Sequence, residues 1–259
     1  MNGLEIVDGD AQGQCEDCIT GNQKKRPYDE KITPTTEILR LTNIDIWGPA
    51  RVPSTRNAIY AMKFHDSGSS HCQSFFLKDR LATTTLYALT AYKNVSEKIT
   101  GKVMVHICTD NTPEFKSKLW EDYMHENGLI FVPTAPYSSG SNGTSERFIG
   151  ITTASVRIML LDSGMSAKWW AEAWSYSEVV ENLLPSAHHP GTIPEECWMG
   201  EKQNVGHLQV WGCIAYVHIP REKGLGKLGN HGQQGRFIGI KTRGIFRILI
   251  PETGEIIRS

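Results

Sequence analysis

The chain has 259 residues, a formal net charge of −1, 39% hydrophobic residues and 21% charged residues. These proportions indicate a folded protein with one large domain or two smaller ones, and they exclude disorder, collagen and coiled coil as the main architecture. No run approaches the roughly 18 uncharged apolar residues of a membrane span, and the first residues carry acids where a secretory signal carries bases. We therefore expect an intracellular protein with no membrane partner.

Charge and cysteines are unevenly spread along the chain. Residues 205–259 hold the bases Arg221, Lys223, Lys227, Arg236, Lys241, Arg243, Arg247 and Arg258 against the acids Glu222, Glu252 and Glu255. This basic end is compatible with a polyanionic partner despite the neutral total. Single cysteines among apolar residues, at Cys72, Cys108, Cys197 and Cys213, are expected to be reduced thiols rather than a disulfide framework.

The first half of the chain alternates between strand-like and helix-like patterns. Residues 1–30 show no periodicity and are predicted to form a tether. Strands over 41–47, 58–64 and 72–77, joined by short turns, indicate an antiparallel meander. A helix over 81–99 ends at Gly101, with Leu81, Leu86, Leu89, Tyr92 and Val95 along its apolar side.

The next elements place the meander in a mixed sheet. Buried strands are predicted over 103–108 and 129–132, and the helix between them, over 113–127, ends before Gly128. The order of strands and helices is that of an α/β protein, a mixed sheet flanked by helices.

The second half begins with a loop over 136–143 that is rich in small residues. Helices follow over 144–162 and 167–184, and the second of them carries core tryptophans at Trp169, Trp170 and Trp174. Beyond Pro185 no further helix is expected. Short strands over 209–219, 235–240, 244–250 and 255–258 predict a small β-unit.

Three acids occupy positions where a carboxylate needs a partner. Asp45 lies inside the first strand, Asp110 follows a buried strand, and Glu146 falls in the first turn of a helix. Each alone could be a cap or a solvated strand end. Together, three hard oxygen ligands at one sheet edge would suit octahedral Mg²⁺ and in-line phosphoryl transfer with two metal ions.

Three motifs around these acids carry a resemblance. The runs 43–49, 109–115 and 136–147 resemble the integrase core of Ty1/copia-type LTR retrotransposons. Residues 111–145 separate the second and third acids, which is the interval of the retroviral-type integrase signature. Further similarity in 15–21, 168–185, 192–195, 211–217 and 235–239 extends the resemblance to the end of the chain.

The resemblance implies a domain organisation. It predicts a tether with a remnant of a zinc module over 1–30, a ribonuclease H-like catalytic core over 31–165, a helical extension and linker over 166–204, and an SH3-like β-domain over 205–259. Cys15 and Cys18 match the second half of the zinc module, but the first histidine in the chain is His65. We therefore expect Cys15 and Cys18 to hold no zinc in this chain.

The resemblance also implies an activity. It describes a DDE polynucleotidyl transferase in which Asp45, Asp110 and Glu146 hold two Mg²⁺ or Mn²⁺ ions for DNA 3′-processing and strand transfer. Its partners would be element and target DNA, its location the nucleus, and the resemblance allows a homo-oligomer. Asn142, Arg147 and Arg157 are candidate DNA contacts, although both arginines could equally solvate their helix.

One departure from the family leaves a second reading open. Gly150 stands where the family usually carries arginine, one helical turn after Glu146, so a phosphate contact is lost. The alternative is a decayed or host-adopted integrase relic that keeps the fold and binds nucleic acid without catalysis.

Overall fold

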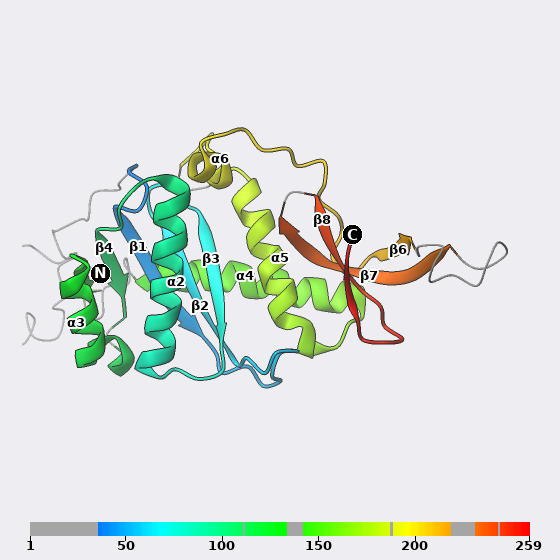
Figure 1. Cartoon of the computed structure of the whole chain (residues 1–259), viewed down its shortest axis with the longest axis horizontal. Coiled ribbons are helices and arrows are strands. Elements are labelled where there is room, and N and C mark those ends of the chain that lie inside the picture. Colours follow the sequence, from blue (N-terminus) through cyan, green and yellow to red (C-terminus); the bar gives the residue numbers. More distant parts are fainter. Residues whose placement is uncertain (1–35, 111, 134–141, 187–188, 219–230, 243) are drawn as a thin grey trace, which may run out of the picture. The chain divides into compact units, whose positions relative to one another are not determined.

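The computed structural model describes residues 36–110, 112–133, 142–186, 189–218, 231–242 and 244–259, without the side chains of residues 133, 142–147 and 242. By its internal contacts the chain divides into residues 1–32 and residues 33–259. All described elements belong to the second of these units (Figure 1).

A mixed five-stranded sheet forms the centre of the first part of this unit. Its strand order is β3-β2-β1-β4-β5. β1 (Leu41–Trp47), β2 (Tyr60–Asp66) and β3 (Cys72–Leu77) form the predicted antiparallel meander. β4 (His106–Thr109) lies parallel to β1, and β5 (Ile130–Pro133) lies parallel to β4. The predicted α/β sheet is therefore confirmed.

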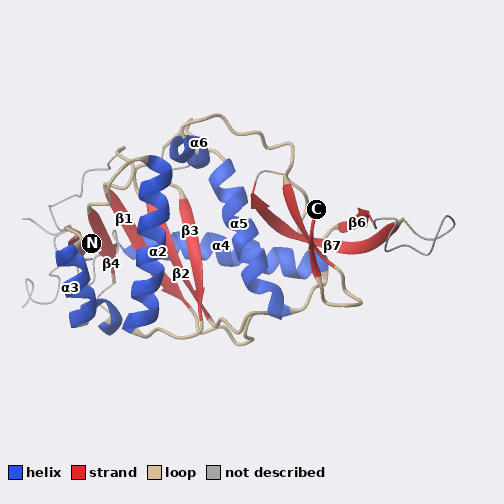
Figure 2. Ribbon diagram, in the orientation of Figure 1, coloured by secondary structure: helices blue, strands red, loops and turns tan. Residues whose placement is uncertain are grey.

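Helices cover both faces of this sheet. On one face, Met62 and Phe64 pack with Leu89 and Tyr92 of α2 (Ala82–Thr100), and the same cluster contains Trp120 of α3 (Lys118–Glu126). A 3₁₀ turn over Pro113–Lys116 precedes α3. On the other face lie α4 (Asn142–Ser163) and α5 (Trp170–Leu183). In Figure 2, α2 crosses the near face of the sheet while α4 passes behind it.

A second sheet follows α6 (Pro194–Met199). It is antiparallel, with the order β6-β7-β8-β9, and consists of β6 (Ile214–His218), β7 (Gly232–Thr242), β8 (Ile245–Leu249) and β9 (Ile256–Arg258). One hydrophobic cluster joins this sheet to α5, in which the Tyr176 ring meets the Phe237 ring edge-on at 5.1 Å. The small β-unit is thus observed, while its boundary at residue 205 stays a prediction.

Several predicted elements need correction. A helix does occur beyond Pro185, because Pro194 begins α6 and Gly200, with φ of 71°, ends it; six residues are too few to show a helical period. Helix 113–127 is interrupted at Ser117. β5 is not fully buried, because it is an edge strand and Ile130 is 52% exposed.

The buried side of α2 also differs from the prediction. Leu81 and Val95 are 62% and 47% exposed, whereas Thr85, Ala88 and Ser96 are buried beside Leu89 and Tyr92. Small residues allow the helix to approach the sheet closely, which a count of large apolar side chains does not detect. The predicted helix end at Gly101 is confirmed by its left-handed backbone, with φ of 66°.

Three smaller expectations can be settled from the described residues. Trp169, Trp170 and Trp174 are buried, as predicted. Cys72, Cys108, Cys197 and Cys213 are free thiols. None of the helices in the described part of the chain is long and apolar enough to cross a bilayer.

Candidate active site

Asp45 and Asp110 are brought to the same level of the sheet by strand register. The parallel strands β1 and β4 pair Leu41 with His106 and Asn43 with Cys108. Asp45 and Asp110 each follow the last of these paired residues by two positions, on strands that run in the same direction. Each aspartate therefore lies just beyond the end of the β1–β4 pairing. The position is the carboxyl end of the parallel strands, where α/β sheets bind their ligands.

The Asp45 side chain lines a shallow hollow on the α4 face of the sheet. Its Oδ1 accepts a hydrogen bond of 2.8 Å from the backbone N–H of Ile46, which helps to orient the carboxylate. The hollow lies between β1, β2 and α4, and its walls are Asn43, Asp45, Lys63, His65, Phe148 and Ile149. Asp45 is thus partly buried and borders this small hollow.

Asp110 is the first residue after β4 and is also partly buried. The Thr112 hydroxyl donates to its Oδ1 at 3.1 Å. This hydrogen bond helps to orient the Asp110 carboxylate.

The third acid is only partly located. Glu146 belongs to α4, but its side chain lies outside the described set, as do those of Asn142 and Arg147. Ile149, one turn further along α4, lines the hollow, and the Phe148 ring stacks on His65 with a centroid distance of 3.7 Å. The distances between Glu146 and the two aspartates therefore stay untested.

Of the other predicted site residues, Arg157 is described by the structure, whereas Cys15 and Cys18 are not. Arg157 is an exposed residue of α4. Cys15 and Cys18 lie outside the described residues, so the zinc expectation is untested. Among the described residues, no three His, Cys, Asp or Glu side chains gather closely enough to hold a metal ion.

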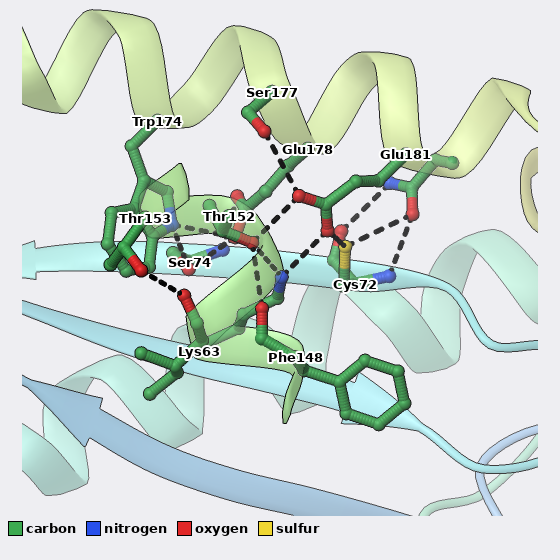
Figure 3. A network of polar contacts seen from close by, with 12 residues as sticks. Lys63, Cys72, Ser74, Phe148, Thr152, Thr153, Trp174, Ser177, Glu178 and Glu181 are labelled. Atoms are coloured by element: carbon green, nitrogen blue, oxygen red, sulfur yellow. Dashed lines mark hydrogen bonds and ion pairs between the residues drawn. The ribbon is translucent and has the colours of Figure 1, made fainter. Parts of the chain in front are cut away.

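A buried polar network next to this hollow was missed by sequence reasoning (Figure 3). Lys63, only 2% exposed, contacts Glu181 of α5 at 2.8 Å and Thr152 of α4 at 2.5 Å. One signal was available, because Lys63 interrupts the apolar run of β2 between Met62 and Phe64. A lysine at such a position requires a buried anion.

Glu178 is the second acid of this network. It accepts hydrogen bonds from the backbone N–H of Ser74 at 2.9 Å and from the Trp174 indole at 3.0 Å, and it also contacts the Ser74 hydroxyl. Burial raises the pKa of Glu178 to about 7, against the opposing influence of Lys63. For Lys63, burial lowers the pKa, but Cys72, Glu181 and Glu178 raise it more, so the net shift is upward.

Comparison with known proteins agrees with the integrase-like core and the β-unit after it. Residues 213–259 match the family model of the retroviral polymerase SH3-like domain. The chain is 27% identical over 257 residues to the retrovirus-related Pol polyprotein from transposon TNT 1-94 of Nicotiana tabacum, a match that covers 99% of this chain and 19% of the relative. An uncharacterized mitochondrial protein of Arabidopsis thaliana is 29% identical over 68 residues, which cover 26% of this chain and 57% of that protein.

Solved structures show the same architecture. A chain of the simian T-cell lymphotropic virus intasome in complex with PP2A regulatory subunit B56 gamma matches with a TM-score of 0.57 at 15% identity, covering 94% of this chain and 84% of that one. The HTLV-2 integrase catalytic core domain in complex with magnesium matches with a TM-score of 0.47 at 17% identity, covering 61% and 95%.

The fold is therefore that of a retroviral-type integrase core followed by an SH3-like sheet. The resemblance to copia-type retrotransposon sequences is confirmed, since the chain is similar over nearly its whole length to the Pol polyprotein of the tobacco transposon. It spans about a fifth of that relative's length.

Proposed function

We propose that this chain is an integrase region that carries out metal-dependent DNA 3′-processing and strand transfer. The observation that carries the proposal is the shared level of Asp45 and Asp110 at the carboxyl ends of two parallel strands. The similarity to a transposon Pol polyprotein and to the SH3-like family supports it.

The donor set fits a divalent metal site. Asp45 and Asp110 supply hard carboxylate oxygens from neighbouring strands, and the helix that contains Glu146 covers the same face. These three residues would hold Mg²⁺ or Mn²⁺, two ions in the complete site. Such ions, when bound, supply activation of the attacking oxygen and neutralise charge on the phosphate. The Ile46 N–H and the Thr112 hydroxyl keep the two aspartates oriented, and no protein nucleophile is required.

The proposed partner is DNA, with a nuclear location and self-association as parts of the same proposal. Asn142, Arg147 and Arg157 on α4 are the candidate contacts near the acids. Some of the bases in residues 205–259 that the structure describes have partners within the protein. Arg236 donates to the Gly212 carbonyl at 2.9 Å and Arg247 lies 3.7 Å from Glu172, whereas Lys241 and Arg258 are exposed.

A second candidate is the relic that binds nucleic acid without catalysis. One observation favours it: Lys63 stands directly opposite Asp45 in the β1–β2 register and lines the same hollow. A fixed ammonium close to a proposed cation site raises the electrostatic cost of binding Mg²⁺. Gly150, where the resembled family usually carries arginine, also favours the relic, because a phosphate contact is lost there.

The experiment that decides between them is a strand-transfer assay on short DNA duplexes with Mg²⁺ or Mn²⁺. We expect activity from the parent chain, none from Asp45→Asn, and parent-like activity from the control Asp122→Asn, an exposed acid of α3. Activity that survives Asp45→Asn would refute the assigned site. DNA binding without strand transfer in the parent chain would establish the relic.

A further inference from the structure

The network around Lys63 joins four elements on the face of the sheet that carries Asp45. Lys63 extends from β2, Cys72 and Ser74 from β3, Thr152 from α4, and Glu178 and Glu181 from α5 (Figure 3). Its partners lie far apart in sequence, since Lys63 and Glu181 are separated by 118 positions. The contacts therefore form only when the helices are packed on the sheet.

Lys63 is the ammonium group beside the buried carboxylate of Glu178 and the partly buried carboxylate of Glu181. Its Nζ donates to Glu181 Oε2 at 2.8 Å, and its charge lowers the pKa of Glu178 against the effect of burial. Glu181 is held further by the Ser177 hydroxyl, which donates to its Oε1 at 3.0 Å. Without Lys63, two acids would stay in a poorly solvated place with no compensating charge.

Thr152 connects this ion pair to α4. Its hydroxyl lies 2.5 Å from Lys63 Nζ, 2.7 Å from Glu181 Oε1 and 3.1 Å from the Phe148 carbonyl oxygen. The Phe148 ring in turn stacks on His65 of β2. In the half of α4 that contains Glu146, the described contacts to β2 include the polar contact between Thr152 and Lys63 and the ring contact between Phe148 and His65.

β2 also pairs with β1, the strand that carries Asp45. In the antiparallel register Lys63 pairs with Asp45 and His65 with Asn43, and directly paired residues project from the same face of a sheet. Lys63, directly opposite Asp45, and His65, two residues further along β2, therefore make the contacts to α4, the helix that contains Glu146.

We propose that Lys63 is a positioning residue, whose ion pair with Glu181 and contact with Thr152 hold the Glu146 half of α4 over Asp45. The effect of Lys63 on metal binding rests on the proposed function, whereas its role in attaching α4 to the sheet does not. A purely structural role would contribute stability without a specific effect on this half of the helix.

The test compares three variants of the full chain by hydrogen exchange and Mn²⁺ titration. Lys63→Met leaves the acids unpaired, whereas Lys63→Met with Glu181→Met removes both charges and restores an apolar contact. Thr152→Val removes only the hydroxyl, with little change of shape. Lys93→Met is the matched control, because Lys93 forms a 3.0 Å ion pair with Glu97 on α2, on the other face of the sheet.

We expect the double variant to recover the unfolding midpoint that Lys63→Met loses. Amides of residues 142–152 should nevertheless exchange about tenfold faster in the double variant and in Thr152→Val, while those of α2 keep their parent rate. Parent-like exchange in residues 142–152 of both variants would overturn the proposal, and Thr152→Val decides alone if the double variant does not fold.

Mn²⁺ binding separates this inference from the proposed function. If the parent and Asp45→Asn bind Mn²⁺ equally, the metal site is refuted, and the exchange rates still decide the role of Lys63. If Asp45→Asn loses Mn²⁺ binding, the double variant should bind it several-fold more weakly than Lys93→Met. Equal affinity in those two variants would contradict the positioning role.

Discussion

Asp45 and Lys63 are direct partners across the β1–β2 pair, and both line the hollow beneath Phe148 and Ile149. Asp45 is a proposed metal ligand. Lys63 is a buried cation whose side chain contacts Glu181 and Thr152. The pairing places an acid and a base next to each other on one face of the sheet, while Glu181 of α5 neutralises the charge of the lysine. A metal site and a structural ion pair can therefore occupy adjacent positions of the same strands.

Glu146→Gln should abolish strand transfer while leaving non-specific DNA affinity and the unfolding midpoint near the parent values. The amide keeps the shape of the side chain but loses the charge that a divalent ion requires. The matched control is Asp162→Asn, an exposed acid at the other end of α4, which should behave like the parent. Equal activity of Glu146→Gln and Asp162→Asn would exclude Glu146 from the catalytic site.

Gly150→Arg should increase DNA affinity, and with a competent site it should increase strand transfer as well. A Cβ atom built at Gly150 meets nothing within 4 Å, so the side chain can be accommodated. Gly150→Ala serves as control, since it should stabilise α4 by up to ~1 kcal/mol without adding charge. A steeper salt dependence of binding for the arginine variant alone would identify a phosphate contact, and identical slopes would argue against one.

Glu178→Gln should change how stability depends on pH. Because the pKa of Glu178 is raised from 4.5 to about 7, the folded protein binds a proton between these values that the unfolded chain has released. This carboxyl therefore favours folding most at low pH, and its contribution decreases as pH rises through that range. The difference in unfolding free energy between parent and variant, measured by urea titration from pH 4.5 to 7.5, should follow this decrease. A constant difference would show that the pKa is not raised.

Lys63→Met should destabilise the protein by about 3–5 kcal/mol at pH 8, the usual cost of removing one partner of a buried ion pair. The cost should be smaller at pH 5, where the abandoned carboxylate of Glu178 can take up a proton. Urea denaturation at the two pH values measures both effects. A cost of less than 1 kcal/mol at either pH would mean that water reaches the network.

Phe237→Ala tests whether the SH3-like sheet unfolds together with the core. Phe237 is 2% exposed and belongs to the same cluster as Trp170 and Trp174 of α5. We expect a loss of about 3–5 kcal/mol, with a single transition by both tryptophan fluorescence and far-UV circular dichroism. Two separated transitions in the parent would instead support an independent domain from about residue 205, as predicted from composition.

Much of the fold was predictable from local patterns. Strand-like runs joined by short turns marked the three meander strands, and turn residues such as Gly101 marked the helix ends. Short elements and close-packed small residues were not predictable, because α6 has too few residues for a period and Ala88 and Ser96 carry little hydrophobic signal. The predicted element boundaries differ from the observed ones by a few residues; β2, for example, begins at Tyr60 and not at residue 58.

For the candidate site, the sequence by itself indicated that Asp45 lies in a strand and that Asp110 follows one, because strand ends are local properties. It placed Glu146 in the first turn of its helix, whereas α4 begins at Asn142, four residues earlier. Only the tertiary structure decided that Asp45 and Asp110 stand at one level, since the register of β1 on β4 depends on pairing across the sheet. Only the tertiary structure also decided that Lys63 is neutralised by Glu181, 118 positions away. A buried charge is tolerated only where the fold brings an opposite charge next to it. The sequence around Lys63 does not show which distant residue that will be.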